Sequence, residues 1–480
     1  MAERRESIHG QWSGRWAFIL AATGSAVGLG NIWKFPYITG ENGGGAFVLV
    51  YLLCIAIIGV PIMIAEIMLG RRGRRSPINT MRHLAFEENA SRFWKYLGWS
   101  GVVAGFLILS YYAVIAGWAV AYIFRTASGT FTGATADGVA SIFSALVSDP
   151  ERLLAWHTIF MVLTMVIVAR GVRSGLEKAV SYLMPALFII LLVLVGYAMN
   201  TDAFAKGFSF MFTPDFRALL YQPNGAGVPV LTAEPLLVAL GHAFFTLSLG
   251  MGAIMVYGSY LPKDTSIVKT TFVIAGMDTL VALLAGLAIF PIVFANGLEA
   301  GSGPGLIFQT LPIAFGHMPG GIFFGSLFFI LLAFAAWSSA ISLIEPAVAW
   351  MVENHGFSRI SATVWAGMTA WLLGIGSIFS FNIWSGEEYQ LFGMTVFDLL
   401  DYLTANIMLP LGGLLIAIFA AWQLRRSTCQ DELGINDGPI FKSWYFLLRY
   451  ISPVAVIIVF LNAIDIVGIF NSVLTYLGLS

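Results

Sequence analysis

Apolar residues gather in long runs along the chain, and short polar segments separate the runs. Runs near or above about 20 residues, the length that crosses a bilayer as a helix, recur from one end to the other. The pattern predicts eleven membrane spans with approximate edges at 13–38, 44–70, 95–124, 155–170, 176–199, 234–260, 266–296, 320–352, 360–380, 394–424 and 443–475. The chain is therefore predicted to be an all-α polytopic membrane protein.

Lys and Arg residues predict the orientation of these spans, because basic loops stay on the cytoplasmic side. If the N-terminus is cytoplasmic, all but five of the 25 basic residues fall in inner segments. The five outer residues are Lys34, Arg125, Arg152, Lys206 and Arg217. This asymmetry predicts a multi-pass protein of the inner (cytoplasmic) membrane with its N-terminus inside, and the odd number of spans places the C-terminus outside.

Composition supports the membrane interpretation and argues against other classes. Hydrophobic residues make up 58% of the chain and charged residues 11%, whereas soluble domains carry about 25% charged residues. A net charge of −1 gives no sign of a nucleic-acid partner. Cys54 lies in an apolar run, so a disulfide to Cys429, the second of two cysteines, is not expected. The basic N-terminus leads into no short apolar core with a cleavage site, so we expect no cleaved signal peptide.

Three outer segments stand out by composition. Segments 126–153 and 200–233 are long and polar, with Gly, Pro and Asp. Segment 297–319 has no basic residue and several helix breakers, which predicts a short helical hairpin that could fold over an opening.

Two predicted spans are interrupted near their middle. Residues 24–31 read GSAVGLGN and residues 244–252 read FFTLSLGMG, so each combines closely spaced glycines with small polar residues. Glycine is unfavourable inside a helix by about 1 kcal/mol relative to Ala. Interrupted spans at matching positions of two halves are typical of inverted-repeat transporters. Close helix packing through small residues is the alternative explanation for either cluster.

The two interruptions predict how the chain is divided. Spans 1–5 would form one five-helix repeat over residues 1–199, and spans 6–10 an inverted second repeat over 234–425. An extracellular loop over 200–233 would join them, and residues 426–480 would add the eleventh span. A broken helix leaves unpaired carbonyls that suit cations and unpaired amides that suit carboxylates.

Four stretches of sequence carry a family resemblance. They are GSAVGLGNIWKFPY (24–37) with ENGGGAF (41–47), FFTLSLGMG (244–252), FAAWSSAISLIEP (334–346), and the pair Gly175 and Pro185. These stretches resemble the first, sixth, eighth and fifth spans of the neurotransmitter:sodium symporter family, especially its bacterial amino-acid members. The resemblance covers nearly the whole chain. It implies sodium-coupled amino-acid symport by alternating access, with Gly175 to Pro185 loosening span five; a simple proline kink is the alternative.

The resemblance also implies two sodium sites, and Na+ is the only cofactor expected. The first site would consist of the carbonyl of Ala26, the side chains of Asn31, Thr246 and Asp278, and the substrate carboxylate. The second would consist of the carbonyls of Gly24, Val27 and Ala335 and the hydroxyls of Ser338 and Ser339. These are hard oxygen ligands, as a small hard cation requires. Back-bonding of the two serines to their own helix is the alternative.

A substrate site is implied between the two interruptions. The amides near Leu29 and Gly30 and the Tyr112 hydroxyl would bind the carboxylate, and the carbonyls of Ala26, Phe245, Thr246 and Ser248 would bind the ammonium. Ile108, Phe245, Met251 and Leu343 would line the side-chain pocket, with Ser339 nearby; plain helix packing is their alternative role. Monoamine-transporting members carry Asp where Gly28 stands, so the substrate is expected to supply its own carboxylate. Because this pocket is apolar, it predicts neutral amino acids with hydrophobic or aromatic side chains. Selectivity among them is expected to be loose, since Met repacks easily.

Gates are implied on both sides of this site. Tyr112 and Phe245 would close over the substrate, with Lys34 and Asp401 paired above them. Lys cannot make the bidentate fork of the Arg that many relatives have, so this pair is expected to be weaker. The inner gate would consist of Trp12, Ser259, Tyr260 and Glu353. His9 stands where the usual Arg partner is expected, and Arg4 or Arg5 is the alternative partner.

Acidic residues inside spans are functional candidates by default, and here they are Glu66, Asp278 and Glu345. Glu66 is expected to accept hydrogen bonds from the loose backbone of span six. His242 is expected to be neutral and hydrogen-bonded and could approach Asp278; a role in proton counterflow is the alternative. Animal members of the family hold chloride beside an Asn and a Ser one turn later, where this chain has Asp278 and Ala282. Transport is therefore predicted to be independent of chloride.

Other functional classes fit the sequence less well. A channel would usually show repeated filter elements, and a membrane enzyme would show a motif such as HExxH or GxSxG; neither is visible. A proton-coupled permease of the same fold is the closest rival, and it would lack the hydroxyl pair Ser338 and Ser339. The expected partners are an amino-acid substrate and the lipid bilayer.

Overall fold

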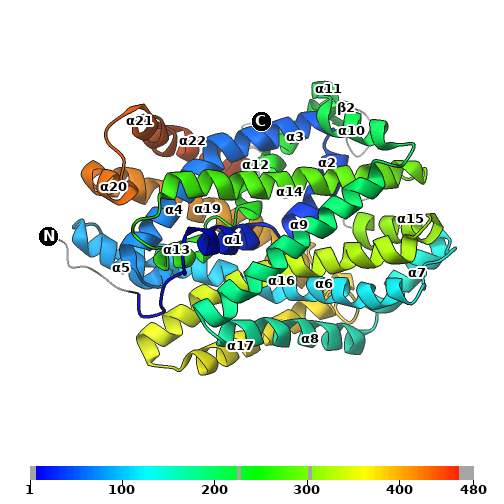
Figure 1. Cartoon of the computed structure of the whole chain (residues 1–480), viewed down its shortest axis with the longest axis horizontal. Coiled ribbons are helices and arrows are strands. Elements are labelled where there is room, and N and C mark those ends of the chain that lie inside the picture. The colour runs from blue at the N-terminus through cyan, green and yellow to red at the C-terminus, as the bar shows by residue number, and fades with distance from the viewer. Residues whose placement is uncertain (1–6, 224–228, 301–304, 464–480) are drawn as a thin grey trace, which may run out of the picture.

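The apolar runs form helices that lie roughly along the long axis of the molecule (Figure 1). The computed structural model describes residues 7–223, 229–300 and 305–463. Within these residues, nine helical segments are long and apolar enough to cross a membrane: Gly45–Gly73, Arg92–Ala127, Pro150–Ala169, Val172–Ala198, Ile267–Ala295, Gly321–His355, Arg359–Phe379, Val396–Gln423 and Pro439–Ile458.

The spans contain the following α-helices: α3 (Gly45–Cys54), α4 (Val60–Gly73), α6 (Lys95–Ala127), α8 (Pro150–Ala169), α9 (Lys178–Ala198), α14 (Ile267–Ala295), α16 (Gly321–His355), α17 (Arg359–Phe379), α18 (Val396–Asp401), α19 (Leu409–Ile418), α21 (Pro439–Phe446) and α22 (Ser452–Ala463). Wider π-helical turns continue several of them: Ile55–Gly59, Val172–Glu177, Tyr402–Met408, Phe419–Gln423 and Leu447–Ile451. Short 3₁₀ turns lie at Arg92–Trp94 and Glu387–Tyr389.

Two further spans are broken, as the glycine clusters predict. In the first, α1 (Arg15–Ala26) and the segment Gly30–Glu41, made of a π-helical turn over Gly30–Lys34 and α2 (Phe35–Glu41), meet at 49°. In the second, α12 (Glu234–Thr246) and α13 (Ala253–Ser259) flank residues 247–252. All eleven predicted spans thus coincide with helix, although the predicted end of the last span, 475, lies outside the described residues.

The fourth span begins earlier than the sequence pattern predicts, at Pro150 instead of residue 155. Asp149 caps this helix, because its side chain accepts a hydrogen bond from the backbone N–H of Arg152 at 3.1 Å. Proline in the first turn has no N–H to leave unpaired. Hydropathy alone does not detect a helix cap, so the polar first turn of this helix was not predicted as part of the span.

Shorter elements gather at the two ends of the bundle (Figure 1). At the left-hand end lie α5 (Pro77–Glu87) and α20 (Arg426–Leu433). Towards the other end lie α7 (Ala136–Val147), α10 (Phe204–Phe212), α11 (Phe216–Leu220), the antiparallel strands β1 (Tyr221–Pro223) and β2 (Pro229–Leu231), and α15 (Leu311–His317). Strand residues Tyr221 and Leu231 are paired. Of the predicted hairpin in 297–319, the structure describes α15 and a π-helical turn over Leu306–Thr310, and residues 301–304 lie outside the described part.

The broken helices lie at the centre of the bundle. In the most apolar stretch of each span, 83% of the residues are buried for the span of α6 and 78% for α16. The corresponding share is 33% for the spans of α8 and α9. Helix α1 packs against both α14 and α16. The interrupted backbone therefore lies inside the protein, away from lipid, where such backbone is tolerated.

The second break is held open by left-handed backbone. Ser248, Gly250 and Gly252 have φ angles of 54°, 78° and 76°, a conformation that glycine adopts without steric cost. The Gly250 N–H donates to Glu66 Oε2 at 3.1 Å, which confirms the predicted role of Glu66. Ser248 Oγ donates to the carbonyl of Ser25 at 2.9 Å and so links the two breaks.

Candidate sodium and substrate sites

Three buried polar side chains from three helices meet beside the first break. Asn31 Nδ2 donates to Asp278 Oδ1 at 2.7 Å, and Thr246 Oγ1 lies 3.1 Å from both carboxylate oxygens of Asp278. None of the three side chains is exposed. The cluster supplies carboxylate, amide and hydroxyl oxygens, which is the ligand chemistry that a hard cation requires. It matches the side chains predicted for the first sodium site.

The predicted second site has one hydroxyl turned toward α1 and one turned away. Ser339 Oγ lies 3.4, 3.1 and 3.2 Å from the carbonyl oxygens of Gly24, Ser25 and Val27. Ser338 Oγ instead lies 3.2 and 3.1 Å from the carbonyl oxygens of Phe334 and Ala335, both in its own helix. Ser338 thus adopts the back-bonded alternative, and Ser339 brings its oxygen to the carbonyl end of α1.

A small cavity of about 20 Å³ lies between the two breaks. It is lined by Ser25, Ala26, Gly28, Leu29, Gly30, Ile108, Tyr112, Phe245, Ser248, Met251, Ser339 and Leu343. Every residue predicted for the substrate site lines this cavity except Thr246, which faces Asp278. Ser25 was not predicted, because nothing in the sequence distinguishes it from the other small residues of the first glycine cluster.

Gly28 lies at the most crowded point of this cavity. A Cβ atom at this position would lie 2.5 Å from Ser339 Oγ and 2.8 Å from the Tyr112 hydroxyl oxygen. The Tyr112 oxygen also accepts a hydrogen bond from the Leu29 N–H at 3.1 Å. Two hydroxyls and the backbone N–H end of the broken helix therefore converge on the space beside Gly28, and this convergence suits a carboxylate.

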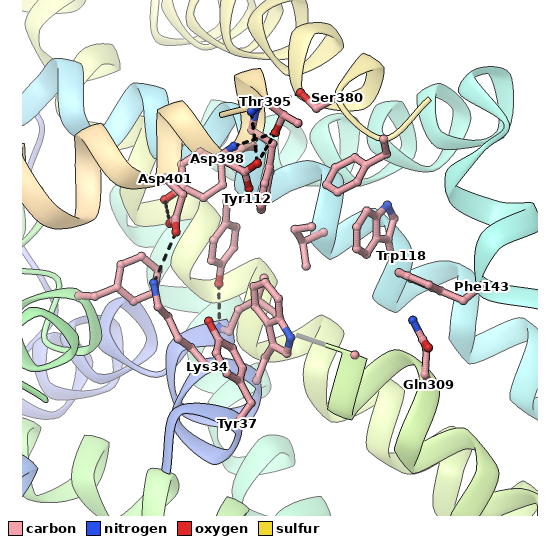
Figure 2. Close-up of a pocket in the computed structure, with 18 residues that line it drawn as sticks. Lys34, Tyr37, Tyr112, Trp118, Phe143, Gln309, Ser380, Thr395, Asp398 and Asp401 are labelled. Atoms are coloured by element: carbon pink, nitrogen blue, oxygen red, sulfur yellow. Dashed lines mark hydrogen bonds and ion pairs between the residues drawn. The ribbon is translucent and has the colours of Figure 1, made fainter. Parts of the chain in front are cut away.

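A larger vestibule of about 560 Å³ lies beyond the small cavity (Figure 2). Figure 2 shows Lys34 and Tyr112 on one side of it and Trp118, Phe143 and Gln309 on the other. Leu29, Tyr112 and Phe245 line both the vestibule and the small cavity. These three residues form the partition between the two spaces.

The predicted outer pair stands at the edge of the vestibule. Lys34 Nζ lies 3.7 Å from Asp401 Oδ2 and 5.0 Å from the centre of the Phe245 ring. Tyr111 also donates from its hydroxyl to Asp401 Oδ1 at 3.0 Å. Tyr111 was missed from the sequence, although its position next to Tyr112 places it on the neighbouring face of α6.

Near the C-terminal end of α16, the Glu353 carboxylate contacts four hydrogen-bond donor groups. His9 Nε2 lies 3.0 Å from Glu353 Oε1, and the N–H and hydroxyl of Ser76 lie 2.7 and 2.5 Å from the carboxylate. Asn79 Nδ2 donates at 2.7 Å. Trp12 donates from its backbone N–H to the Tyr260 carbonyl at 3.0 Å. His9 is thus the partner that replaces Arg, and Arg4 and Arg5 lie outside the described residues.

A second ion pair near this gate was not found from the sequence. Arg359 lies 3.0 and 2.5 Å from the two carboxylate oxygens of Glu345, and Tyr260 donates to Glu345 Oε1 at 2.7 Å. Glu345 is fully buried. An acid inside a span needs a partner, and Arg359, 14 residues later at the start of the next helix, was the signal available in the sequence.

Comparison with known proteins decides the family. Residues 9–137 and 147–474 match the family described as Sodium:neurotransmitter symporter family. The chain belongs to the sodium:neurotransmitter symporter family. Like other members it is a sodium-coupled transporter, embedded in a membrane by many spans, and the recognition made from the glycine clusters is confirmed.

Relatives within the sodium:neurotransmitter symporter family cover almost the whole chain. An uncharacterized sodium-dependent transporter of Bacillus subtilis, YhdH, is 39% identical over 95% of this chain and 98% of its own length. An uncharacterized sodium-dependent transporter of Haemophilus influenzae is 32% identical over 94% of this chain and 97% of its own. The crystal structure of MhsT in complex with L-phenylalanine matches with a TM-score of 0.86 at 43% identity, over 96% of this chain and all of that one. The predicted fold class is therefore confirmed.

His242 differs from its prediction. Its ring lies 6.0 Å from the Phe35 ring and 5.4 Å from the Tyr51 ring, centre to centre. Among the described residues, neither ring nitrogen has a hydrogen-bond partner. The predicted hydrogen bond of His242 is therefore not found among the described residues, where its ring packs against Phe35 and Tyr51 instead. His242 lines a separate cavity of about 530 Å³ that also touches Lys34 and Asp401.

Proposed function

We propose that this transporter carries neutral amino acids with hydrophobic or aromatic side chains. The observation that carries the proposal is the lining of the small cavity, which is polar at Gly28 and Tyr112 and apolar at Ile108, Met251 and Leu343. A molecule with a carboxylate at one end and an apolar side chain at the other would match this lining, and the cavity of about 20 Å³ would widen around it. MhsT, 43% identical, was crystallised with L-phenylalanine, which has this chemistry.

Sodium would bind at two places on either side of the substrate. The first site is the cluster of Asn31, Thr246 and Asp278, completed by the Ala26 carbonyl and the substrate carboxylate. The second lies where Ser339 meets the carbonyls of Gly24 and Val27, with Ala335 and a rotated Ser338. Because the substrate carboxylate would be a ligand of the first ion, substrate and sodium binding would strengthen each other.

Alternating access would depend on the two gates. With Lys34 and Asp401 separated, a substrate in the vestibule would reach Tyr112 and Phe245. With the contacts of Trp12, Tyr260 and Glu353 broken, the cavity would open at the other end. Following the distribution of Lys and Arg, the end with Glu353 faces the cytoplasm, and the protein resides in the cytoplasmic membrane with its C-terminus outside.

Chloride would have no part in this cycle. Asp278 supplies a fixed negative charge beside the first sodium site, and Ala282, one turn later on α14, is a buried methyl group with no hydroxyl for an anion. Two negative charges about 4 Å apart repel each other by roughly 4 kcal/mol at an effective dielectric constant near 20. An anion in addition to Asp278 would therefore be disfavoured.

The test is uptake of labelled phenylalanine and leucine into proteoliposomes. An inward sodium gradient should drive accumulation, and an equal potassium gradient should not. In competition, tryptophan and leucine should displace labelled phenylalanine much more strongly than tryptamine, which lacks the carboxylate. Equal uptake in potassium would refute sodium coupling, and strong displacement by tryptamine alone would refute the substrate class.

A further inference from the structure

A basic cavity lies at the surface, at the segment that joins the span Gly45–Gly73 to the span Arg92–Ala127. It measures about 990 Å³ and is lined by Arg82, His83, Ala85, Phe86, Asn89, Ala90, Arg92 and Lys95. These residues come from α5, the loop after it and the first turns of the span Arg92–Ala127. Three of them are Arg or Lys and none is acidic, so the cavity presents concentrated positive charge.

The acidic residues of the same segment are bound to other cations. Glu87 lies 3.6 Å from Arg72, and Glu88 lies 2.8 Å from Arg425. Within the part of the chain that the structure describes, no carboxylate forms an ion pair with Arg82, Arg92 or Lys95. Among the described residues, Arg82, Arg92 and Lys95 are therefore without a carboxylate partner.

Three exposed aromatic residues accompany the cavity, and we call them its aromatic rim: Phe86 lines it, and Phe93 and Tyr96 follow the lining residues Arg92 and Lys95 in the sequence. Phe86, Phe93 and Tyr96 are 81%, 76% and 53% exposed. Phe93 and Tyr96 stack with ring centres 6.0 Å apart, and Lys95 Nζ lies 4.9 Å from the centre of the Tyr96 ring. Rings so exposed would be unfavourable in water, whereas aromatic residues are enriched where a bilayer meets water.

The depth of the segment places both features at that boundary. The span Gly45–Gly73 ends four residues before α5 begins, and the next span begins at Arg92. Segment 77–96 therefore lies at the ends of two spans, at the level of lipid headgroups. The opposite face of α5 is anchored in the protein, because Ile78, Met81 and Leu84 are buried.

We propose that this cavity binds the headgroup of an anionic phospholipid. Arg82, Arg92 and Lys95 would hold the phosphate, since juxtamembrane clusters of Lys and Arg recognise anionic lipids. Phe86, Phe93 and Tyr96 would contact the glycerol backbone and the first methylenes of the acyl chains. The aromatic rim favours a lipid over a soluble phosphate, which would make no use of it.

The site has a structural link to the inner gate. The first turn of α5 contains Asn79, which donates to Glu353, and Ser76 immediately before α5 donates to the same carboxylate. The helix that carries Arg82 and Phe86 thus also holds Glu353 in place. A bound lipid would steady α5 and favour the conformation in which the inner gate is closed.

The test uses the whole protein in nanodiscs of phosphatidylcholine, alone or mixed with phosphatidylglycerol, and counts retained lipids by native mass spectrometry. The wild type should retain phosphatidylglycerol, and the triple variant Arg82→Gln/Arg92→Gln/Lys95→Gln should bind it roughly 10- to 100-fold more weakly. A matched control, Lys178→Gln/Lys269→Gln/Lys442→Gln, removes three exposed charges from outside the cavity and should bind like the wild type. Equal retention by all three proteins, or equal loss in both variants, would overturn the proposal.

A second measurement needs no variant. Acetylation of Lys95 in the wild type, followed by peptide mass spectrometry, should slow several-fold when phosphatidylglycerol is present, relative to Lys178 in the same sample. Adding soluble glycerol phosphate to phosphatidylcholine nanodiscs should give no such protection. If Lys95 and Lys178 slow equally, or if glycerol phosphate protects as well as the lipid, the site does not bind a phospholipid.

Discussion

Gly28 faces Ser339 so closely that a methyl group added to Gly28 would lie 2.5 Å from Ser339 Oγ. This single approach connects the predicted substrate site to the predicted second sodium site, because the same oxygen lies 3.2 Å from the Val27 carbonyl. The absence of a side chain at Gly28 thus preserves the position of a hydroxyl that faces α1.

Gly28→Ala should therefore lower the kcat/KM of amino-acid uptake by at least about tenfold, through displacement of Ser339 and Tyr112. Gly276→Ala is the matched control, since a Cβ there meets nothing within 4 Å and the helix α14 continues through it. Initial rates in proteoliposomes at saturating sodium measure both. Normal transport by Gly28→Ala would show that the substrate does not use this space.

The two neighbouring serines should respond differently to the loss of their hydroxyls. Ser339→Ala removes an oxygen that faces three carbonyls of α1, so it should raise the sodium concentration needed for half-maximal uptake by about tenfold. Ser338→Ala removes a hydroxyl that is bonded to its own helix, and the change should be within about twofold. Sodium titrations of phenylalanine uptake give both values. If the larger effect falls on Ser338, that hydroxyl rotates to bind sodium.

Asp278→Asn should weaken the apparent affinity for sodium, because the amide keeps an oxygen ligand but removes the negative charge. The wild type should transport equally well in chloride and in gluconate at fixed sodium. In the variant, chloride should take the place of the lost negative charge, so uptake should be faster in chloride than in gluconate. Unchanged sodium dependence in Asp278→Asn would mean that this residue is not a ligand, and a large loss of wild-type uptake in gluconate would reveal a chloride site.

Arg359→Gln should destabilise the protein by about 3–5 kcal/mol, because it leaves the buried carboxylate of Glu345 without its partner. The double variant Arg359→Gln/Glu345→Gln should recover most of this loss, since it removes both charges. Thermal unfolding of the four proteins in one detergent completes a double-mutant cycle. Additive effects of the two substitutions would show that the ion pair contributes nothing to stability.

The sequence by itself determined the spans, the two breaks and the residues around them. Each of these depends on local chemistry. Apolar runs are long enough for a bilayer, glycines interrupt a helix, and acidic residues inside a span are unfavourable unless they have a partner or a function. Because Gly28, Tyr112 and Phe245 lie in or beside such features, the family resemblance could assign them residue by residue.

Only the tertiary structure decided which groups meet. The pairing of His9 with Glu353 joins residues 344 positions apart, and that of Glu345 with Arg359 depends on how α16 and α17 turn against each other. The direction of the Ser338 hydroxyl, the aromatic surroundings of His242 and the basic cavity at Lys95 likewise follow from packing. Hydropathy fixes the depth of a residue in the membrane, whereas its partner depends on helix rotation and side-chain rotamer, and these are set by contacts between distant segments.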